Sequence, residues 1–261
     1  MERIVSARLS FQETGNKDSP LLFFIHGGGV SRWMWQKQVD YFTTYHCIAV
    51  DLPEHGQSRE AGNFSIEQSA KQCFSLIEEK AANKAVHLIG FSLGAQVAIE
   101  MLCQHSIRIT SAMINSALVS PSSLLNRSVA YTAQFALPLA KWERFAKAQA
   151  KMLSIPEDQF QIYFHESKQM RAQTFARVMK ENSSFFIPPS FRSVSTRMLA
   201  TVGEKESRLM RKSLLDLTYA NEHCQNLTIK GYGHGYSLAN PKAFNKLLQR
   251  WVEKEEWWDD N

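Results

Sequence analysis

The chain has 261 residues, 44% of them hydrophobic, and a formal net charge of +5 at neutral pH. This length suits one large domain with an appended or inserted part, and the interspersion of basic with acidic residues argues against a nucleic-acid-binding protein. No apolar run approaches the roughly 18 residues of a membrane-spanning helix, and the first residues lack an apolar signal core. We therefore expect a cytoplasmic protein without a membrane span.

The first third of the chain alternates apolar runs with helical patterns. A continuous apolar run over residues 21–25 predicts a buried strand that ends at His26-Gly27-Gly28-Gly29. Ser65 has the position of an N-cap before a further helical pattern. The other patterns predict strands over 3–12 and 45–50 and helices over 33–42 and 65–82.

The same alternation continues with strands over 85–91 and 109–118 on either side of a helix over 93–104. Strands that alternate with helices are typical of a mainly parallel sheet covered by helices on both faces. We therefore predict an α/β fold with a doubly wound sheet.

The alternation stops after residue 118, and about 75 residues separate that strand from the next, which is longer than a structureless loop normally reaches. Helical periodicity over 131–152 and 159–180 and a capping-box pattern from Ser154 indicate helices in this stretch. We expect residues 120–195 to form a helical cap inserted into a core made of residues 1–119 and 196–261.

Beyond this insertion the pattern of strands and helices resumes. The last amphipathic helix is followed by an acidic, aromatic end over 253–261 that we interpret as a frayed tail. The elements expected here are strands over 197–202 and 226–230 and helices over 208–219 and 241–251.

The segment Gly90-Phe91-Ser92-Leu93-Gly94 joins a predicted strand to a predicted helix. Glycines two positions before and after the serine permit a sharp strand-to-helix turn, which holds the side chain exposed at the carboxyl edge of the sheet. An N-capping role would explain the serine but not the paired glycines. The pattern therefore predicts Ser92 as a nucleophile.

A serine hydroxyl is a weak nucleophile and needs a base, for which histidine is best suited near neutral pH. Of the eight histidines, His234 directly follows the last predicted strand and so reaches the same edge as Ser92. The imidazolium that forms needs a carboxylate, and the strand over 197–202 delivers Glu204 and Glu206 to that edge. We choose Glu206 as the triad acid and keep Glu204 as the alternative.

The alkoxide of a tetrahedral intermediate needs backbone N–H donors. We expect Leu93 and Gly28 to supply them, with Gly29 as an alternative to Gly28 and with His26 as an anchor of the glycine loop. Several residues are candidates for the substrate pocket, although each aromatic one is individually more typical of ordinary core. They are Gly29, Trp33, Phe91, Tyr232 and Tyr236, with Phe160, Phe164 and Phe175 from the cap.

Together these motifs resemble the cap-bearing α/β-hydrolases of the esterase, lactonase and C–C hydrolase type, from about residue 21 to 251 apart from the cap. The sequence departs from that family at two places. Glu206 stands where members typically carry Asp. The family motif Asp-x-x-Gly-x-Gly-x-Ser ends here as Glu54-His55-Gly56-Gln57-Ser58. The resemblance implies hydrolysis through an acyl-serine intermediate, without a metal or organic cofactor. The motifs that carry it are His26-Gly27-Gly28 with Trp33 and Trp35, residues 51–58, 90–94 and 202–206, and Gly233-His234 with Asn240-Pro241.

We therefore predict a serine hydrolase that cleaves a small-molecule carboxylic ester, thioester or lactone. Two alternatives stay open on the same scaffold, because a fold does not fix a substrate. One is a ligand receptor with little turnover. The other is a cofactor-free acyltransferase or lyase that uses the same three side chains. No oligomeric state follows from the sequence.

Overall fold

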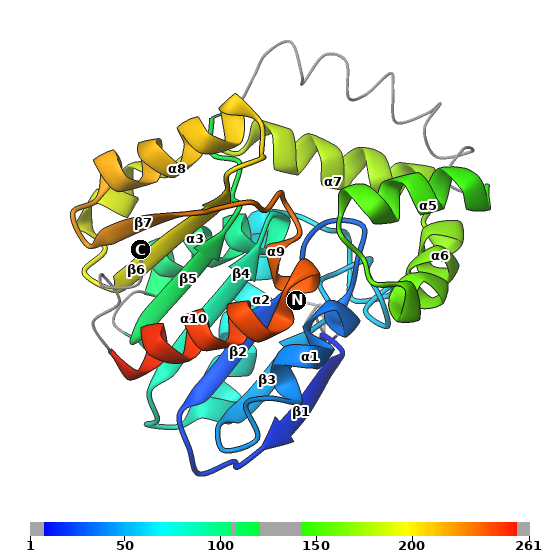
Figure 1. Ribbon diagram of the computed structural model, residues 1–261. Helices are drawn as coiled ribbons and strands as arrows, with labels where there is room; N and C mark the ends of the chain where they lie inside the picture. The colour runs from blue at the N-terminus through cyan, green and yellow to red at the C-terminus, as the bar shows by residue number, and fades with distance from the viewer. Residues whose placement is uncertain (1–7, 106–107, 121–141, 255–261) are drawn as a thin grey trace, which may run out of the picture.

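The computed structural model describes residues 8–105, 108–120 and 142–254, and these contain a seven-stranded sheet with the order β1-β3-β2-β4-β5-β6-β7 (Figure 1). β1 runs antiparallel to β3, and every other neighbouring pair is parallel. The predicted mainly parallel α/β sheet is confirmed. Its strands are β1 (Phe11–Gly15), β2 (Leu21–Ile25), β3 (His46–Val50), β4 (Val86–Phe91), β5 (Ser111–Asn115), β6 (Arg197–Gly203) and β7 (Cys224–Ile229).

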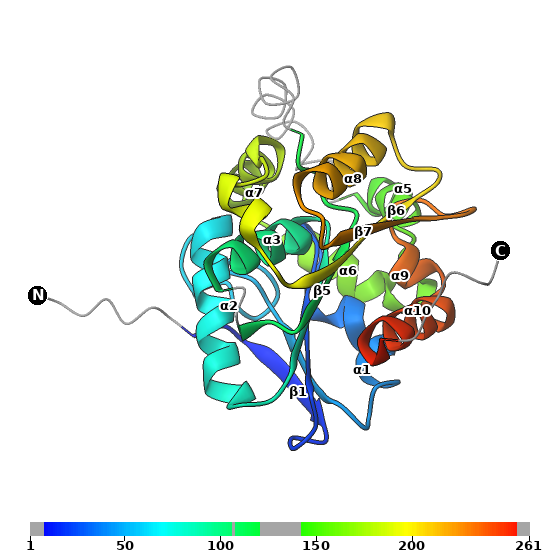
Figure 2. The same ribbon diagram turned by 90° about the vertical axis from the view of Figure 1, so that its left-hand side faces the viewer.

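Helices cover both faces of the sheet, which is why the central strands β2 to β5 are continuously buried. Figure 2 shows α2 (Ile66–Ala81) and α3 (Leu93–His105) on one side and α1 (Gln36–Val39) and α10 (Pro241–Glu253) on the other. The first side, with α8 (Arg208–Ala220), buries one apolar cluster, and the second buries another around Trp35 and Phe244. The two clusters hold the strands in the order that fixes the loops at their carboxyl ends.

The described residues between β5 and β6 contain three helices and two short 3-10 segments, and Figure 1 shows α5, α6 and α7 together above one end of the sheet. The expected single helix over 159–180 is two helices, because Met170 and Arg171 have extended backbones and end the first of them. Residues 121–141 of the expected cap lie outside the described residues. The elements are α5 (Glu143–Met152), η3 (Glu157–Gln159), α6 (Phe160–Gln169), α7 (Ala172–Ser184) and η4 (Pro189–Ser193).

The two predicted serine caps have different outcomes. Ser65 accepts a hydrogen bond from the Gln68 N–H and begins α2, as expected. The prediction for Ser154 is wrong, because its φ of 57° is left-handed and its N–H donates to the Lys151 carbonyl. Ser154 thus follows the end of α5, and η3 begins after Pro156 without a side-chain cap.

Several predicted boundaries also differ from the structure. The first strand is β1, which begins at Phe11, while residues 1–7 lie outside the described part. β5 stops at Asn115 instead of residue 118, because Ser116 turns the chain with a φ of 54°. The helix expected over 33–42 is a 3-10 turn, η1 (Arg32–Trp35), followed by the short α1.

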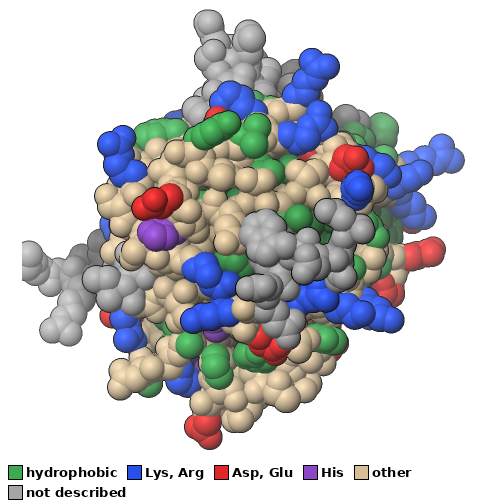
Figure 3. Space-filling model, turned by 60° about the vertical axis from the view of Figure 1, so that its left-hand side comes forward, with side chains coloured by type: hydrophobic (Ala, Val, Ile, Leu, Met, Phe, Trp, Pro, Cys, Tyr) green, Lys and Arg blue, Asp and Glu red, His purple; other side chains and the backbone are tan. Residues whose placement is uncertain are grey.

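Within the described ranges no helix has both the length and the apolar character needed to cross a bilayer. Figure 3 shows one face, on which Lys and Arg side chains are dispersed among acidic, polar and apolar ones. No continuous basic stripe is visible on that face.

Candidate active site

Ser92 lies on a tight turn between β4 and α3, with a left-handed φ of 53°. A Cβ on Gly90 would lie 2.5 Å from the Gly94 carbonyl oxygen, and a Cβ on Gly94 would lie 2.3 Å from the carbonyl oxygen of Ile25. Both distances are far inside van der Waals contact with backbone atoms that cannot move aside. The paired glycines are therefore required by the close approach of β4, α3 and β2 that exposes the serine.

Ser92, His234 and Glu206 lie in one hydrogen-bonded series, although they are far apart in sequence. His234 Nε2 is 3.1 Å from Ser92 Oγ, and His234 Nδ1 is 2.7 Å from Glu206 Oε2. Each residue follows the carboxyl end of a parallel strand, namely β4, β6 and β7. The order of these strands brings the three side chains together at one edge of the sheet.

The Glu206 carboxylate is buried, with its side chain 3% exposed, and it has three hydrogen-bond donors. Ser116 Oγ and the Gly203 N–H donate to Oε1 at 2.7 and 2.8 Å, and His234 Nδ1 occupies Oε2. Burial alone would raise the pKa of Glu206, but its hydrogen bonds and the charge of His234 outweigh burial and hold the pKa below its ordinary value. Glu206 is therefore ionised near neutral pH and can stabilise an imidazolium.

Glu204, the alternative acid, has a different partner. Its Oε2 accepts a hydrogen bond from the Gly231 N–H at 2.8 Å, in the loop that leads from β7 to His234. Glu204 therefore makes its hydrogen bond to this loop and not to the imidazole of His234. The geometry favours Glu206 over Glu204 as the partner of His234.

The expected oxyanion donors line the same cavity as Ser92. Leu93 is the first residue of α3, so its N–H has no acceptor within the helix. Gly28 and Gly29 lie opposite, and a Cβ on Gly28 would make only ordinary contact, 3.5 Å from Val178. Packing therefore does not require glycine at position 28.

His26 has a structural position, as expected for a loop anchor. Its Nε2 accepts a hydrogen bond from the Leu52 N–H at 2.9 Å, and Nδ1 lies 2.7 Å from the Gly27 carbonyl oxygen, to which it donates. Burial lowers the pKa of His26 to about 4, so the ring is neutral near neutral pH. These contacts fix the start of the glycine loop.

A cavity of about 390 Å³ opens at Ser92 and His234 beneath α5, α6 and α7. Most of its wall is apolar, and Met152, at its mouth, is 79% exposed. Of the phenylalanines expected from the cap only Phe175 lines it, while the rings of Phe160 and Phe164 stack on each other. The rest of the wall was not predicted from the sequence and comprises Gln149, Met152, Leu153, Tyr163, Ser167, Met170, Val178, Met179 and Asn182.

Four other expected pocket residues, Trp33, Phe91, Tyr232 and Tyr236, lie outside this cavity, and for them the prediction needs correction. The Phe91 ring packs against the His234 ring with centroids 4.9 Å apart. Trp33 is buried and donates its Nε1–H to Glu166 of α6 at 2.8 Å. Tyr236 packs between Tyr232 and Phe244 instead. Of the five expected pocket residues of the core, only Gly29 lines the cavity.

Glu54, where the sequence departs from the resembled motif, connects α7 to the loop after β3. Its Oε1 accepts from Thr174 Oγ1 at 2.7 Å, and its Oε2 accepts from Arg177 Nε and the Phe64 N–H, both at 2.9 Å. Burial would raise the pKa of Glu54, but these hydrogen bonds outweigh it and hold the pKa below its ordinary value. No spacing pattern in the sequence links position 54 to 174, so this contact was missed.

A serine on a left-handed turn between a parallel strand and a helix, in contact with a histidine after the last strand, defines the nucleophile-elbow class of α/β proteins. The model of the alpha/beta hydrolase family matches residues 22–247, and the chain belongs to this family.

Two relatives and one solved structure show the range of the similarity. Over 250 residues the chain is 25% identical to a putative 2-succinyl-6-hydroxy-2,4-cyclohexadiene-1-carboxylate synthase of Haemophilus influenzae, covering 89% of this chain and 97% of that protein. Over 242 residues it is 21% identical to an (E)-2-((N-methylformamido)methylene)succinate hydrolase of Acinetobacter baylyi, covering 89% and 90%. The enol-lactonase structure from Burkholderia xenovorans LB400 matches with a TM-score of 0.78 at 16% identity, covering 94% and 96%, which shows the shared fold.

Proposed function

We propose that this protein is a serine hydrolase that cleaves a carboxylic ester, thioester or lactone with a triad of Ser92, His234 and Glu206. The observation that carries the proposal is the unbroken hydrogen-bond series from Glu206 Oε2 through both ring nitrogens of His234 to Ser92 Oγ. Such a series is what general-base activation of a hydroxyl requires.

In the proposed reaction His234 Nε2 takes the proton from Ser92 Oγ as the oxygen attacks the substrate carbonyl. The tetrahedral intermediate collapses when the imidazolium returns that proton to the leaving oxygen or sulfur, which departs and leaves acyl-Ser92. Water, deprotonated by His234, then attacks the acyl carbon and releases the acid with Ser92 restored. Glu206 remains ionised throughout and stabilises the imidazolium.

The remaining parts of the proposal concern the oxyanion and the cap. The N–H groups of Leu93 and Gly28 hold the oxyanion, and residues 120–195 act as a cap over it. The mainly apolar wall formed by α5, α6 and α7 supports an acyl group as the occupant of the cavity. A hydrolase and an enol-lactonase among similar proteins support hydrolysis of an activated carbonyl.

One specific observation favours a second candidate, a cofactor-free lyase that uses the same three side chains. The Haemophilus influenzae relative, 25% identical, is named a synthase. In a lyase of this kind Ser92 and His234 would move a proton without forming an acyl-enzyme. The two candidates therefore differ in whether Ser92 becomes acylated during turnover.

The proposal is tested by measuring turnover of ester, thioester and lactone panels by the wild type and by Ser92→Ala. We expect Ser92→Ala to lose at least about a hundredfold in kcat/KM with an unchanged circular dichroism spectrum, because nucleophile and base act as a unit. We also expect Ser92 of the wild type to be labelled by a fluorophosphonate. Ser120→Ala is the matched control, since Ser120 contacts Asp216 and not His234.

The outcomes separate the candidates. Labelling of Ser92 without turnover of any panel member would favour the lyase. Neither labelling nor turnover would contradict the hydrolase and favour a ligand receptor. Full activity in Ser92→Ala would remove the serine from the mechanism.

A further inference from the structure

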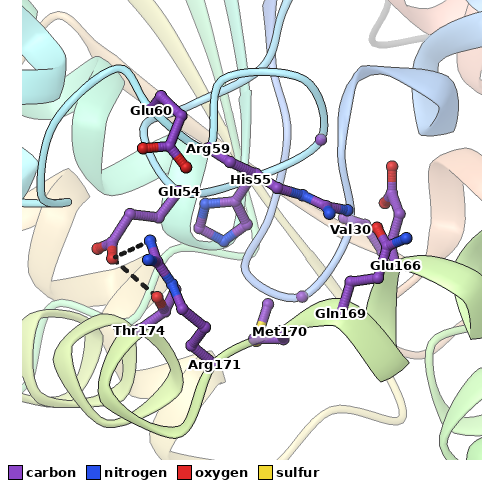
Figure 4. Close-up of a pocket in the computed structure, with 12 residues that line it drawn as sticks. Val30, Glu54, His55, Arg59, Glu60, Glu166, Gln169, Met170, Arg171 and Thr174 are labelled. Atoms are coloured by element: carbon purple, nitrogen blue, oxygen red, sulfur yellow. Dashed lines mark hydrogen bonds and ion pairs between the residues drawn. The ribbon is translucent and has the colours of Figure 1, made fainter.

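A second cavity, of about 210 Å³, adjoins the cavity at Ser92, and the two share Gly29 and Met170 in their walls. The wall of the second cavity is polar over about half its extent, whereas that of the first is mainly apolar, and the charged side chains of the second cavity come from the loop after β3 and from the α6–α7 region. Figure 4 shows these side chains around the cavity, with His55 at its centre. We call it the polar pocket.

Of the three acidic side chains of the polar pocket, two accept hydrogen bonds from other residues and the third is exposed. Glu54 is bound by Thr174 and Arg177, as described above. Glu166 accepts from Ser31 Oγ and Trp33 Nε1, and burial raises its pKa above the ordinary value. Glu60 is exposed at the rim.

Arg59 faces Glu166, and its positive charge opposes the effect of burial on the pKa of that carboxyl group. Arg59 is partly buried and lines the polar pocket, and it makes neither a hydrogen bond nor an ion pair with any part of the chain that the structure describes. Figure 4 shows it extended across the pocket with its guanidinium directed toward Glu166 and Gln169. A guanidinium presents five donors in a planar fork that matches a carboxylate.

His55 also lines the polar pocket, with a ring nitrogen that can accept but not donate a hydrogen bond and that therefore does not bind a carboxylate. Its side chain is buried, its Nδ1 lies 2.9 Å from the Pro53 carbonyl oxygen, and its Nε2 has no hydrogen-bond partner among the described residues. Burial lowers the pKa of His55 to about 4, so near neutral pH Nδ1–H donates to Pro53 and Nε2 is an unused acceptor. Unsatisfied buried polar atoms are uncommon in folded proteins.

We infer that the polar pocket is an anion subsite in which Arg59 binds a carboxylate at the far end of the substrate, so that the preferred substrates are monoesters or lactones of dicarboxylic acids. This inference rests on the proposed function for the reaction at Ser92. The carboxylate lies beside Gly29 and pairs with Arg59, while the scissile carbonyl occupies the adjoining apolar cavity. Arg171, 60% exposed and 3.8 Å from Glu54, adds positive charge at the rim.

The first test compares aryl monoesters of succinate, glutarate and adipate with the same esters methylated at the distal carboxyl group. For at least one chain length we expect wild-type kcat/KM to favour the free acid over its methyl ester by about tenfold or more. Arg59→Ala should abolish this preference by lowering kcat/KM for the free acids more than for the methyl esters, because only the free acids carry the group that pairs with Arg59. Arg192→Ala, which removes an exposed charge in η4, is the control and keeps the preference.

The second test does not depend on turnover. Sodium succinate, glutarate and adipate are compared with sodium butyrate at matched ionic strength for their effect on the melting temperature. At least one dicarboxylate should stabilise the wild type and Ser92→Ala but not Arg59→Ala.

The results distinguish this inference from the proposed function. Equal losses on acid and methyl esters in Arg59→Ala, or no preference in the wild type, would overturn the anion subsite while leaving ester hydrolysis intact. If no ester is turned over, the proposed function fails. The anion subsite is then still supported if a dicarboxylate raises the melting temperature in a way that depends on Arg59. Absence of that stabilisation as well overturns it.

Discussion

Ser116 Oγ donates a hydrogen bond to one carboxylate oxygen of Glu206 at 2.7 Å while His234 occupies the other oxygen at the same distance. Ser116 follows β5 and has a left-handed φ of 54°, which turns it toward the carboxylate. The hydroxyl therefore fixes the carboxylate that orients the imidazole.

We expect Ser116→Ala to lower kcat by about three- to tenfold with little change in KM, because it removes one hydrogen bond to a charged group. Its loss also weakens one of the contacts that hold the pKa of Glu206 down. Activity at acidic pH should therefore be lost at a higher pH than in the wild type, as a pH profile of kcat would measure. An unchanged profile would assign Ser116 a purely structural part.

Glu206→Gln should cost about a hundredfold or more in kcat, since an amide cannot stabilise the imidazolium and can favour the wrong tautomer. Glu204→Gln should cost less than about tenfold, because an amide oxygen can still accept from the Gly231 N–H. Steady-state kinetics of the two variants on one ester compare them directly. The reverse ranking would make Glu204 the triad acid.

Gly94→Ala should lower the free energy of unfolding by about 2 kcal/mol or more, the cost of forcing atoms into a packed interior. The new methyl group would lie 2.3 Å from the Ile25 carbonyl oxygen. Gly233→Ala is the control, because a Cβ there meets no atom within 4 Å. Urea unfolding measures both, and equal stabilities would contradict the account of the turn.

Because the pKa of Glu166 is raised, we expect the free energy of unfolding to depend on pH through this group. Burial is the leading cause of the shift, so the folded state binds a proton more tightly than the unfolded chain, whose carboxyl titrates near the ordinary value of 4.5. Stability contributed by this group is therefore present below pH 4.5 and falls as pH rises from there through the raised pKa of the folded state.

Glu166→Gln keeps polar partners for Trp33 and Ser31 but cannot ionise. The variant should gain in free energy of unfolding relative to the wild type as pH is raised from 4.5 to neutrality, as denaturant titrations at several pH values would measure. A constant difference across that range would show that Glu166 is not held in its protonated form by burial.

The sheet and the series of Ser92, His234 and Glu206 follow from local sequence, because buried strands, glycine spacing and strand-end loops leave local patterns. The parallel order brings the ends of β4, β6 and β7 to one edge, so three separate motifs predict one site. The preference for Glu206 over Glu204 was open in the sequence, since both follow β6 within a few residues. Only the direction of each carboxylate separates them.

The cavity wall was largely missed for a physical reason. It is built from the packing of α5 to α7, and residues such as Met152 and Asn182 have no spacing that marks them as facing Ser92. The break at Met170 was also missed, because the periodicity of α6 continues into α7 and no proline or glycine marks the interruption. Glu54 lies in a turn after β3, and its partners Thr174 and Arg177 lie in a helix distant in sequence.

The left-handed backbone at Ser92 places a cost on the residue that is proposed to do the chemistry. A side chain in that region of φ and ψ is less favourable than glycine by about 1–2 kcal/mol. Ser92→Gly should therefore yield a more heat-resistant but inactive protein. Directed evolution for thermal tolerance alone would drift toward glycine at this position, so screens of this scaffold must retain an activity requirement.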